Sequence, residues 1–217
     1  MVTIFIIAIF IMSVVIHEVS HGMAALWQGD PTAKYMDRLS LNPLKHIDIF
    51  GSIIVPIIFF ISKGFPFGWA KPVPYNPYNL RDQKYGPAIV GVAGPLANIS
   101  IALIFGIFLK ILLVAGKVSL SGTDPFFEIF SWAITLNIIL AVFNLIPFPP
   151  LDGSKLLFAL VPISEEIKIQ LEQYGFMVLI FIIFLFPALF YPVSVLISSV
   201  ISLFFKFVVG ISVGSML

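Results

Sequence analysis

Long stretches without any charged side chain constrain this chain more than any other feature. No Asp, Glu, Lys or Arg occurs before Glu18, and none occurs between Gln173 and Phe205. Only 11% of the 217 residues are charged, against about 25% in soluble domains. A soluble fold would have to expose much of this apolar surface and would aggregate. The chain is therefore expected to be an all-α polytopic membrane protein.

The apolar stretches predict the number of helices. A helix needs about 20 mostly apolar residues to cross the hydrocarbon core. Residues 47–61 are apolar but short, which suits a tilted or half-inserted helix, and 173–205 is long enough for two helices separated near Pro187 and Pro192. With the spans at 2–27, 87–115 and 125–146, we expect about six transmembrane helices with short extended, β-like loops between them.

The same arrangement predicts a single membrane-embedded domain over residues 1–217, with a core at about 1–160 and two additional helices at about 173–213. The first stretch lacks a basic opening and a cleavage site, so we interpret it as a retained span and not a signal peptide. In this arrangement the loops at 28–48 and 63–86 lie on opposite faces. They carry three and four Lys or Arg, so the positive-inside rule does not choose an orientation.

Composition also limits the chemistry. The chain has no cysteine, which excludes disulfides, thiolate metal sites and cysteine nucleophiles. The net charge is +1 and there is no basic run, so we expect the lipid bilayer and not nucleic acid as the environment. The sequence leaves the oligomeric state open, including a homo-oligomer.

The first apolar span contains the sequence I-H-E-V-S-H-G, with His17, Glu18 and His21. Charged or strongly polar side chains at this depth are costly, so they mark function. Residues four apart share one face of a helix, and two imidazoles can therefore bind one metal ion. Glu18 lies beside that ion, as a base that takes a proton from a metal-activated water would. The alternative is a chance match to a short pattern.

A catalytic zinc usually has three protein ligands, and without cysteine the third must be a carboxylate or His46. Asp152 is the leading candidate because it follows an apolar span in the proline-rich turn N-L-I-P-F-P-P-L-D-G. The prolines forbid a regular helix there, and Gly153 would permit an unusual backbone angle. Asp152 as a simple helix N-cap is the alternative. Asp48 and His46 are the other candidate ligands.

Three separated motifs, HEVSHG at 17–22, AGPLAN at 93–98 and NLIPFPPLDG at 144–153, occur in this order. Together they resemble the site-2 protease family of intramembrane zinc metalloproteases. The segments LNPLKHIDIFGS (41–52) and FGWAKPVPYNPYN (67–79) resemble its short prokaryotic members. Some members have a further helix before the zinc-binding one, or a PDZ or CBS domain, and no such segment occurs in this sequence.

The resemblance implies that His17, His21 and Asp152 bind one Zn²⁺ and that Glu18 activates water. Asn98 matches a polar position in the central core helix of the family, and Asn144 would lie close to the active site because it shares a motif with Asp152. Both amides could donate hydrogen bonds to a scissile carbonyl or its oxyanion. Helix–helix hydrogen bonding is the alternative for both. The implied substrates are single-span membrane proteins, and the implied location is the cell membrane, with the site toward the cytosol.

The loops suggest how a substrate could be held. A helical substrate must unwind before its peptide bonds can react, and R-L-S-L at 38–41 and K-P-V-P-Y at 71–75 could pair with the unwound strand. The alternative is an interfacial loop with Trp69, Tyr75 and Tyr78 among the lipid headgroups.

Two functions of other classes use the same residues. A membrane metal-ion or proton transporter could employ His17, Glu18, His21 and Asp152, although the two halves show no inverted repeat. A non-catalytic membrane chaperone or binding protein would have no use for Glu18 beside the ion.

Overall fold

The computed structural model describes residues 2–63, 68–120, 124–185 and 187–212. These residues form helices and connecting loops and contain no strand, so the all-α expectation is confirmed and the β-like loops contain no regular strand. The helical elements are α1 (Val2–Trp27), α2 (Thr32–Tyr35), η1 (Pro43–His46), η2 (Phe50–Ile54), α3 (Val55–Lys63), η3 (Pro77–Asn79), α4 (Gly86–Val114), α5 (Pro125–Asn144), α6 (Gly153–Leu160), α7 (Glu165–Leu185), η4 (Pro187–Phe190), α8 (Tyr191–Phe204) and η5 (Phe205–Val209).

Four helical stretches in the described residues are long and apolar enough to cross a membrane: α1, α4, α5 and residues 188–209. The expected count of six is therefore not confirmed. The helix α3 has nine residues, which is about 14 Å at 1.5 Å per residue and too short to span. The helix α7 begins at Glu165, before the uncharged stretch that starts at residue 173, and it ends before the predicted break at Pro187.

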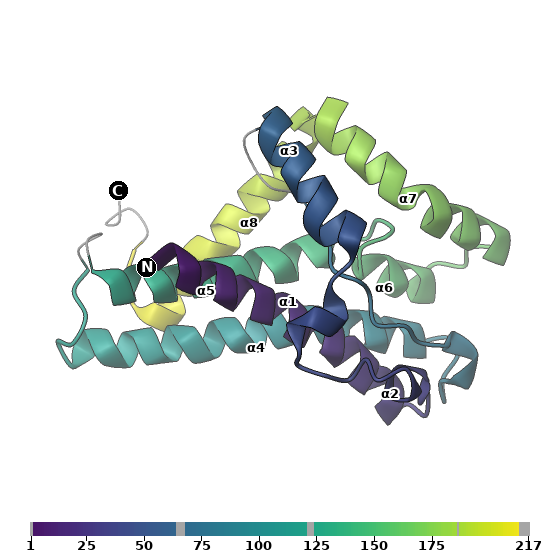
Figure 1. Ribbon diagram of the computed structural model, residues 1–217, viewed down its shortest axis with the longest axis horizontal. Helices are drawn as coiled ribbons and strands as arrows, with labels where there is room; N and C mark the ends of the chain where they lie inside the picture. The colour runs from purple at the N-terminus through teal and green to yellow at the C-terminus, as the bar shows by residue number, and fades with distance from the viewer. Residues whose placement is uncertain (1, 64–67, 121–123, 186, 213–217) are drawn as a thin grey trace.

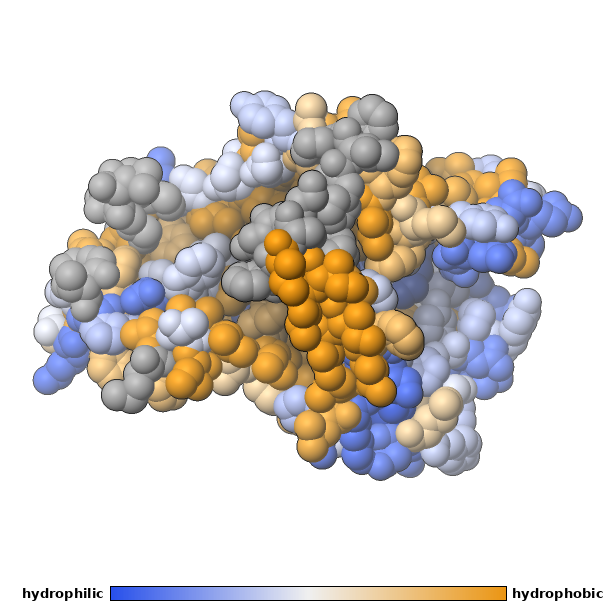
Figure 2. Space-filling view, turned by 45° about the horizontal axis from the view of Figure 1, so that its top comes forward, coloured by the Kyte–Doolittle hydropathy of each residue, from blue (hydrophilic) through white to orange (hydrophobic). Residues whose placement is uncertain are grey.

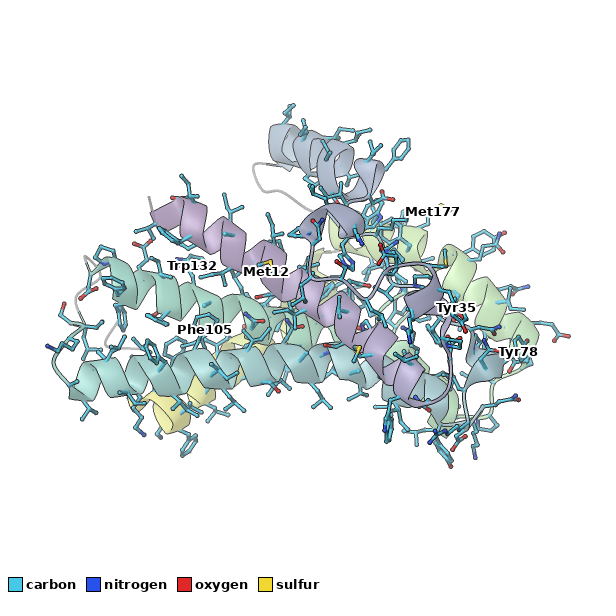
Figure 3. The ribbon with its side chains drawn as sticks, turned by 60° about the horizontal axis from the view of Figure 1, so that its bottom comes forward. Met12, Tyr35, Tyr78, Phe105, Trp132 and Met177 are labelled. Atoms are coloured by element: carbon cyan, nitrogen blue, oxygen red, sulfur yellow. The ribbon has the colours of Figure 1, made fainter. Side chains whose placement is uncertain are left out.

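Helices α1, α4 and α5 lie side by side and form the centre of the molecule (Figure 1). His21 contacts the Val90 carbonyl while His17 contacts Asn98, so α1 and α4 are antiparallel. In Figure 3 the side chains of Phe105 and Trp132 lie toward the end at which α1 begins, and Tyr35 and Tyr78 lie at the opposite end. Toward the first of these ends, α8 and η5 close an apolar core that includes Leu109, Ile134 and Phe205.

The loops after α1 and before α4 lie at one end of the molecule, so their expected placement on opposite faces is wrong. The amide of Lys71 donates to the carbonyl of His46 (2.9 Å), and the amide of Asn76 donates to Asp30 Oδ2 (2.7 Å). Burial pushes the pKa of Asp30 upward, but hydrogen bonds from Thr32, Asn79 and Asn76 outweigh it and hold that pKa below its ordinary 3.8. The charged Asp30 thus ties the two loops together.

The surface agrees with a membrane setting. Figure 2 shows hydrophobic residues over the middle of one face and hydrophilic residues gathered toward the two ends of the long axis. Many large apolar side chains on the spanning helices are exposed, including Ile4 at 71% and Ile104 at 67%. Apolar side chains that protein does not cover are stable when lipid covers them.

Candidate metal centre

The two histidines of α1 face the inside of the helix bundle. His17 and His21 are each only 6% exposed, and both rings point toward α4. Gly94 of α4 makes this approach possible, because a Cβ there would lie 2.5 Å from His21 Nε2 and 2.7 Å from His17 Cε1. The glycine of the A-G-P-L-A-N motif therefore leaves the space that the two imidazoles occupy.

Asp152 completes this cluster. The chain leaves α5 after Asn144, turns through the prolines and places Asp152 directly before α6. Its carboxylate makes no capping hydrogen bond to a backbone amide at the start of α6, so the N-cap alternative does not explain this side chain. Instead, Oδ2 lies 3.1 Å from His17 Nε2 and 3.2 Å from His21 Nε2.

Gly153 serves a different purpose from the expected one. It is not among the residues with a positive φ in the described chain, so the turn needs no unusual backbone angle there. A Cβ at Gly153 would instead lie 2.2 Å from the Leu145 carbonyl oxygen. The glycine is required because two backbone segments of the turn come into direct contact.

The donor atoms suit a tetrahedral metal. The Val90 carbonyl can only accept, so His21 donates from Nδ1 (2.7 Å), and its Nε2 faces Asp152. His17 likewise donates from Nδ1 to Asn98 Oδ1 (2.6 Å). One ligand atom from each of His17, His21 and Asp152 lies within 4.8 Å of the others. Zinc bonds of about 2.1 Å in a tetrahedron separate two ligand atoms by about 3.4 Å, close to the distances observed.

Two buried asparagine side chains, Asn98 and Asn137, form a hydrogen-bonded chain that ends at the ring of His17. Asn98 is fully buried, and its Nδ2 donates to Asn137 Oδ1 (2.9 Å). The Asn137 amide in turn donates to Ser13 Oγ (2.9 Å) and to the Ala133 carbonyl. Both amides thus take part in helix–helix hydrogen bonds, and Asn98 orients the ring of His17, a kind of contact that commonly orients histidines in metal sites.

Ser13 and Asn137 are two residues of this network that the sequence did not predict. Neither belongs to a motif, but Asn137 is an isolated amide within the apolar helix α5, and such residues usually face the inside of a bundle. The inward position of Asn137 was therefore predictable from the sequence. Its hydrogen-bond partners were not predictable, because they depend on how α1, α4 and α5 pack.

Glu18 and Lys155 lie beside the cluster. Glu18 Oε2 accepts a hydrogen bond from the Val73 amide (2.9 Å), and its charge acts on both His17 and Lys155. Lys155 Nζ lies 3.1 Å from Asp152 Oδ1, the oxygen that the histidines do not contact. The two oxygens of Asp152 thus have separate partners, which orients the carboxylate toward the histidines.

The other candidate residues lie outside this cluster. His46 Nε2 donates to the Ser40 carbonyl, and Asp48 accepts from the Gly51 amide (2.7 Å). Neither belongs to the three-residue metal group. Asn144 is half-buried and donates to the Leu140 carbonyl one turn earlier. The substrate roles of Asn98 and Asn144 stay predictions.

Comparison with known proteins agrees with this geometry. The model of peptidase family M50 matches residues 110–186, a range that includes Asp152 but not α1. The Bacillus subtilis (strain 168) protein named "Putative zinc metalloprotease YwhC" is 39% identical over 183 residues, covering 82% of this chain and 78% of that protein. This chain belongs to peptidase family M50. A second relative, "Putative zinc metalloprotease Rip2" of Mycolicibacterium smegmatis (strain ATCC 700084 / mc(2)155), is 29% identical over 87% of this chain and 69% of its own length. No solved structure matches this M50 protein.

Proposed function

We propose that this M50 protein is an intramembrane zinc metalloprotease in which His17, His21 and Asp152 hold one zinc ion. The observation that carries the proposal is the convergence of the two imidazole Nε2 atoms on Asp152 Oδ2 at 3.1 and 3.2 Å. The metalloprotease names of both relatives agree with it. Bound zinc would supply a Lewis acid that lowers the pKa of water to about 7 and polarises a carbonyl.

The residues of the chain would perform the remaining steps. Glu18 follows the first ligand on α1 and has one carboxylate oxygen in the bond to Val73. Its other oxygen would accept a proton from the attacking water and return it to the leaving amine. Asn98 and the Val90 carbonyl hold the two imidazoles in one tautomer. Substrates would be single-span membrane proteins whose helix unwinds locally at the site.

Metal removal tests this function. Purified protein is expected to contain about one zinc per chain and to cut a generic single-span substrate in detergent. A chelator should stop cleavage and zinc should restore it. The chain has no cysteine nucleophile, and the proposed mechanism depends on water activated by the metal. Transport of zinc or protons into liposomes without any cleavage would overturn the protease assignment in favour of the transporter alternative.

We further propose that the protein is multi-pass in the cell membrane with the metal centre toward the cytosol. The structure places both loops that precede α4 at the end of the bundle that carries the site. Within the described residues, more Lys and Arg lie in these loops (Lys34, Arg38, Lys45, Lys71, Arg81, Lys84) than at the opposite end (Lys110, Lys117, Lys206). The positive-inside rule then favours a cytosolic position for the loops.

The absence of cysteine makes this orientation easy to test. Single cysteines at Tyr35 and Leu120, both exposed and at opposite ends, would be treated with a membrane-impermeant maleimide in whole cells. Leu120→Cys is expected to react in intact cells, and Tyr35→Cys only after permeabilisation. The reverse pattern would place the metal centre outside.

A further inference from the structure

The segment Trp69–Asn76 crosses the loop end of the molecule, and we call it the strap. Three alternate amides of the strap donate hydrogen bonds: Trp69 to the Gly51 carbonyl (3.0 Å), Lys71 to the His46 carbonyl (2.9 Å) and Val73 to Glu18 Oε2 (2.9 Å). Donors on every second residue are typical of an extended backbone. The amides of this edge of the strap thus contact η2, η1 and α1 in turn.

The contact with Glu18 is the one that involves the reaction. Val73 lies between Pro72 and Pro74, which have no amide hydrogen. Its N–H is therefore the one backbone donor in this triplet, and it is directed at the carboxylate of Glu18. The Val73 side chain is 6% exposed and packs over Gly22, where a Cβ would lie 2.8 Å from Val73 Cγ1.

The strap is fixed by further contacts. Arg38 Nη2 donates to the Lys71 carbonyl (2.9 Å), and the Asn76 amide donates to Asp30 Oδ2 (2.7 Å). The ring of Tyr75 lies 5.6 Å from Lys155 Nζ, which also contacts Asp152. A donor that is held at several points can hold its acceptor in place.

We propose that the Val73 amide is a positioning group for Glu18. An unrestrained glutamate on a helix samples several rotamers and loses side-chain entropy when it is ordered. The hydrogen bond to Oε2 restricts these rotamers and leaves the second oxygen free to take the proton. The strap thus positions Glu18 through a backbone N–H, and this role is separate from any contact that the strap makes with a substrate. This inference rests on the proposed role of Glu18.

Two variants at one position separate the amide from the side chain. Val73→Pro removes the N–H, and a residue that precedes a proline favours extended or polyproline backbone, a region that proline can also adopt. Val73→Ala keeps the N–H and removes only the apolar packing. We expect Val73→Pro to lower kcat about 10–100-fold relative to Val73→Ala, because small misplacements of a reacting group cost about this much. KM and zinc content should be alike in the two variants. Equal kcat values, or a faster Val73→Pro enzyme, would overturn the proposal.

A second measurement needs neither zinc nor cleavage. In zinc-free protein, the melting temperature of Val73→Pro should fall below that of Val73→Ala by about 2–4 °C more when Glu18 is present than in a Glu18→Ala background. An equal difference in both backgrounds would mean that the amide and Glu18 are not coupled. This result is independent of whether the protein is a protease.

Hydrogen exchange provides a check that requires no change at Val73. A peptide covering residues 71–75 contains few amides, since Pro72 and Pro74 have none. Exchange in that peptide should speed up in Glu18→Ala compared with the unmodified protein. Unchanged exchange would contradict the proposed bond.

Discussion

Glu18→Gln is expected to lower kcat by about 100-fold to 10,000-fold while the protein keeps its zinc. General acid–base catalysis contributes rate factors of this size, and an amide of the same shape cannot accept a proton from water. The Gln side chain keeps an oxygen that can accept the Val73 hydrogen bond, so the strap should remain in place. The three proposed ligands are untouched.

The measurement is single-span substrate cleavage with zinc content determined on the same samples. Glu166→Gln is the matched control, because Glu166 is exposed on α7, outside the metal group. That variant should cleave like the unmodified protein. Retained cleavage in Glu18→Gln would assign proton transfer to another group or the activity to a contaminant, and loss of zinc would give Glu18 a structural role.

The membrane-spanning core could be predicted because local physical chemistry determines it. An uninterrupted apolar stretch must form a helix in lipid, and a glycine with φ of 106° follows its end at Gly29. The predicted span at 2–27 agrees with α1, and the spans at 87–115 and 125–146 agree with α4 and α5 within about two residues. The pair His17 and His21 was predictable from helical periodicity alone.

The arrangement of the loops could not be predicted, because it depends on contacts between residues far apart in the chain. Asp30 reads as an ordinary residue of a helix stop, yet it binds the amide of Asn76. Through such contacts the segments on either side of α3 return to one end of the bundle, and α3 does not separate them across the bilayer. The same limit applies to Asn137, whose position inside α5 was visible but whose partners on α1 and α4 were not.

The candidate third metal ligand could be predicted only in part from the sequence. Sequence physics favoured Asp152 but left Asp48 and His46 open, since a carboxylate before a helix is also a common cap. The structure distinguishes them by contacts. Asp152 makes no cap bond and faces both imidazoles, whereas Asp48 accepts from the Gly51 amide as an ordinary turn residue does.

Asp152→Asn and Asp48→Asn therefore form a matched pair with opposite expected results. Asparagine at 152 keeps the size of the side chain but removes the anionic oxygen that faces the histidines, so zinc affinity should fall by more than the roughly 10–100-fold that outer contacts contribute. Asparagine at 48 still offers Oδ1 to the Gly51 amide, so zinc affinity should be unchanged.

Competition with a chromogenic chelator would measure both affinities, and thermal unfolding of the zinc-free proteins would show that both variants are folded. Cleavage should follow the zinc content, absent in Asp152→Asn at low zinc and normal in Asp48→Asn. If Asp48→Asn lost the metal while Asp152→Asn kept it, the ligand set would be wrong. The contact between Asp152 and the histidines would then be an ion pair between neighbouring helices and not a place for zinc.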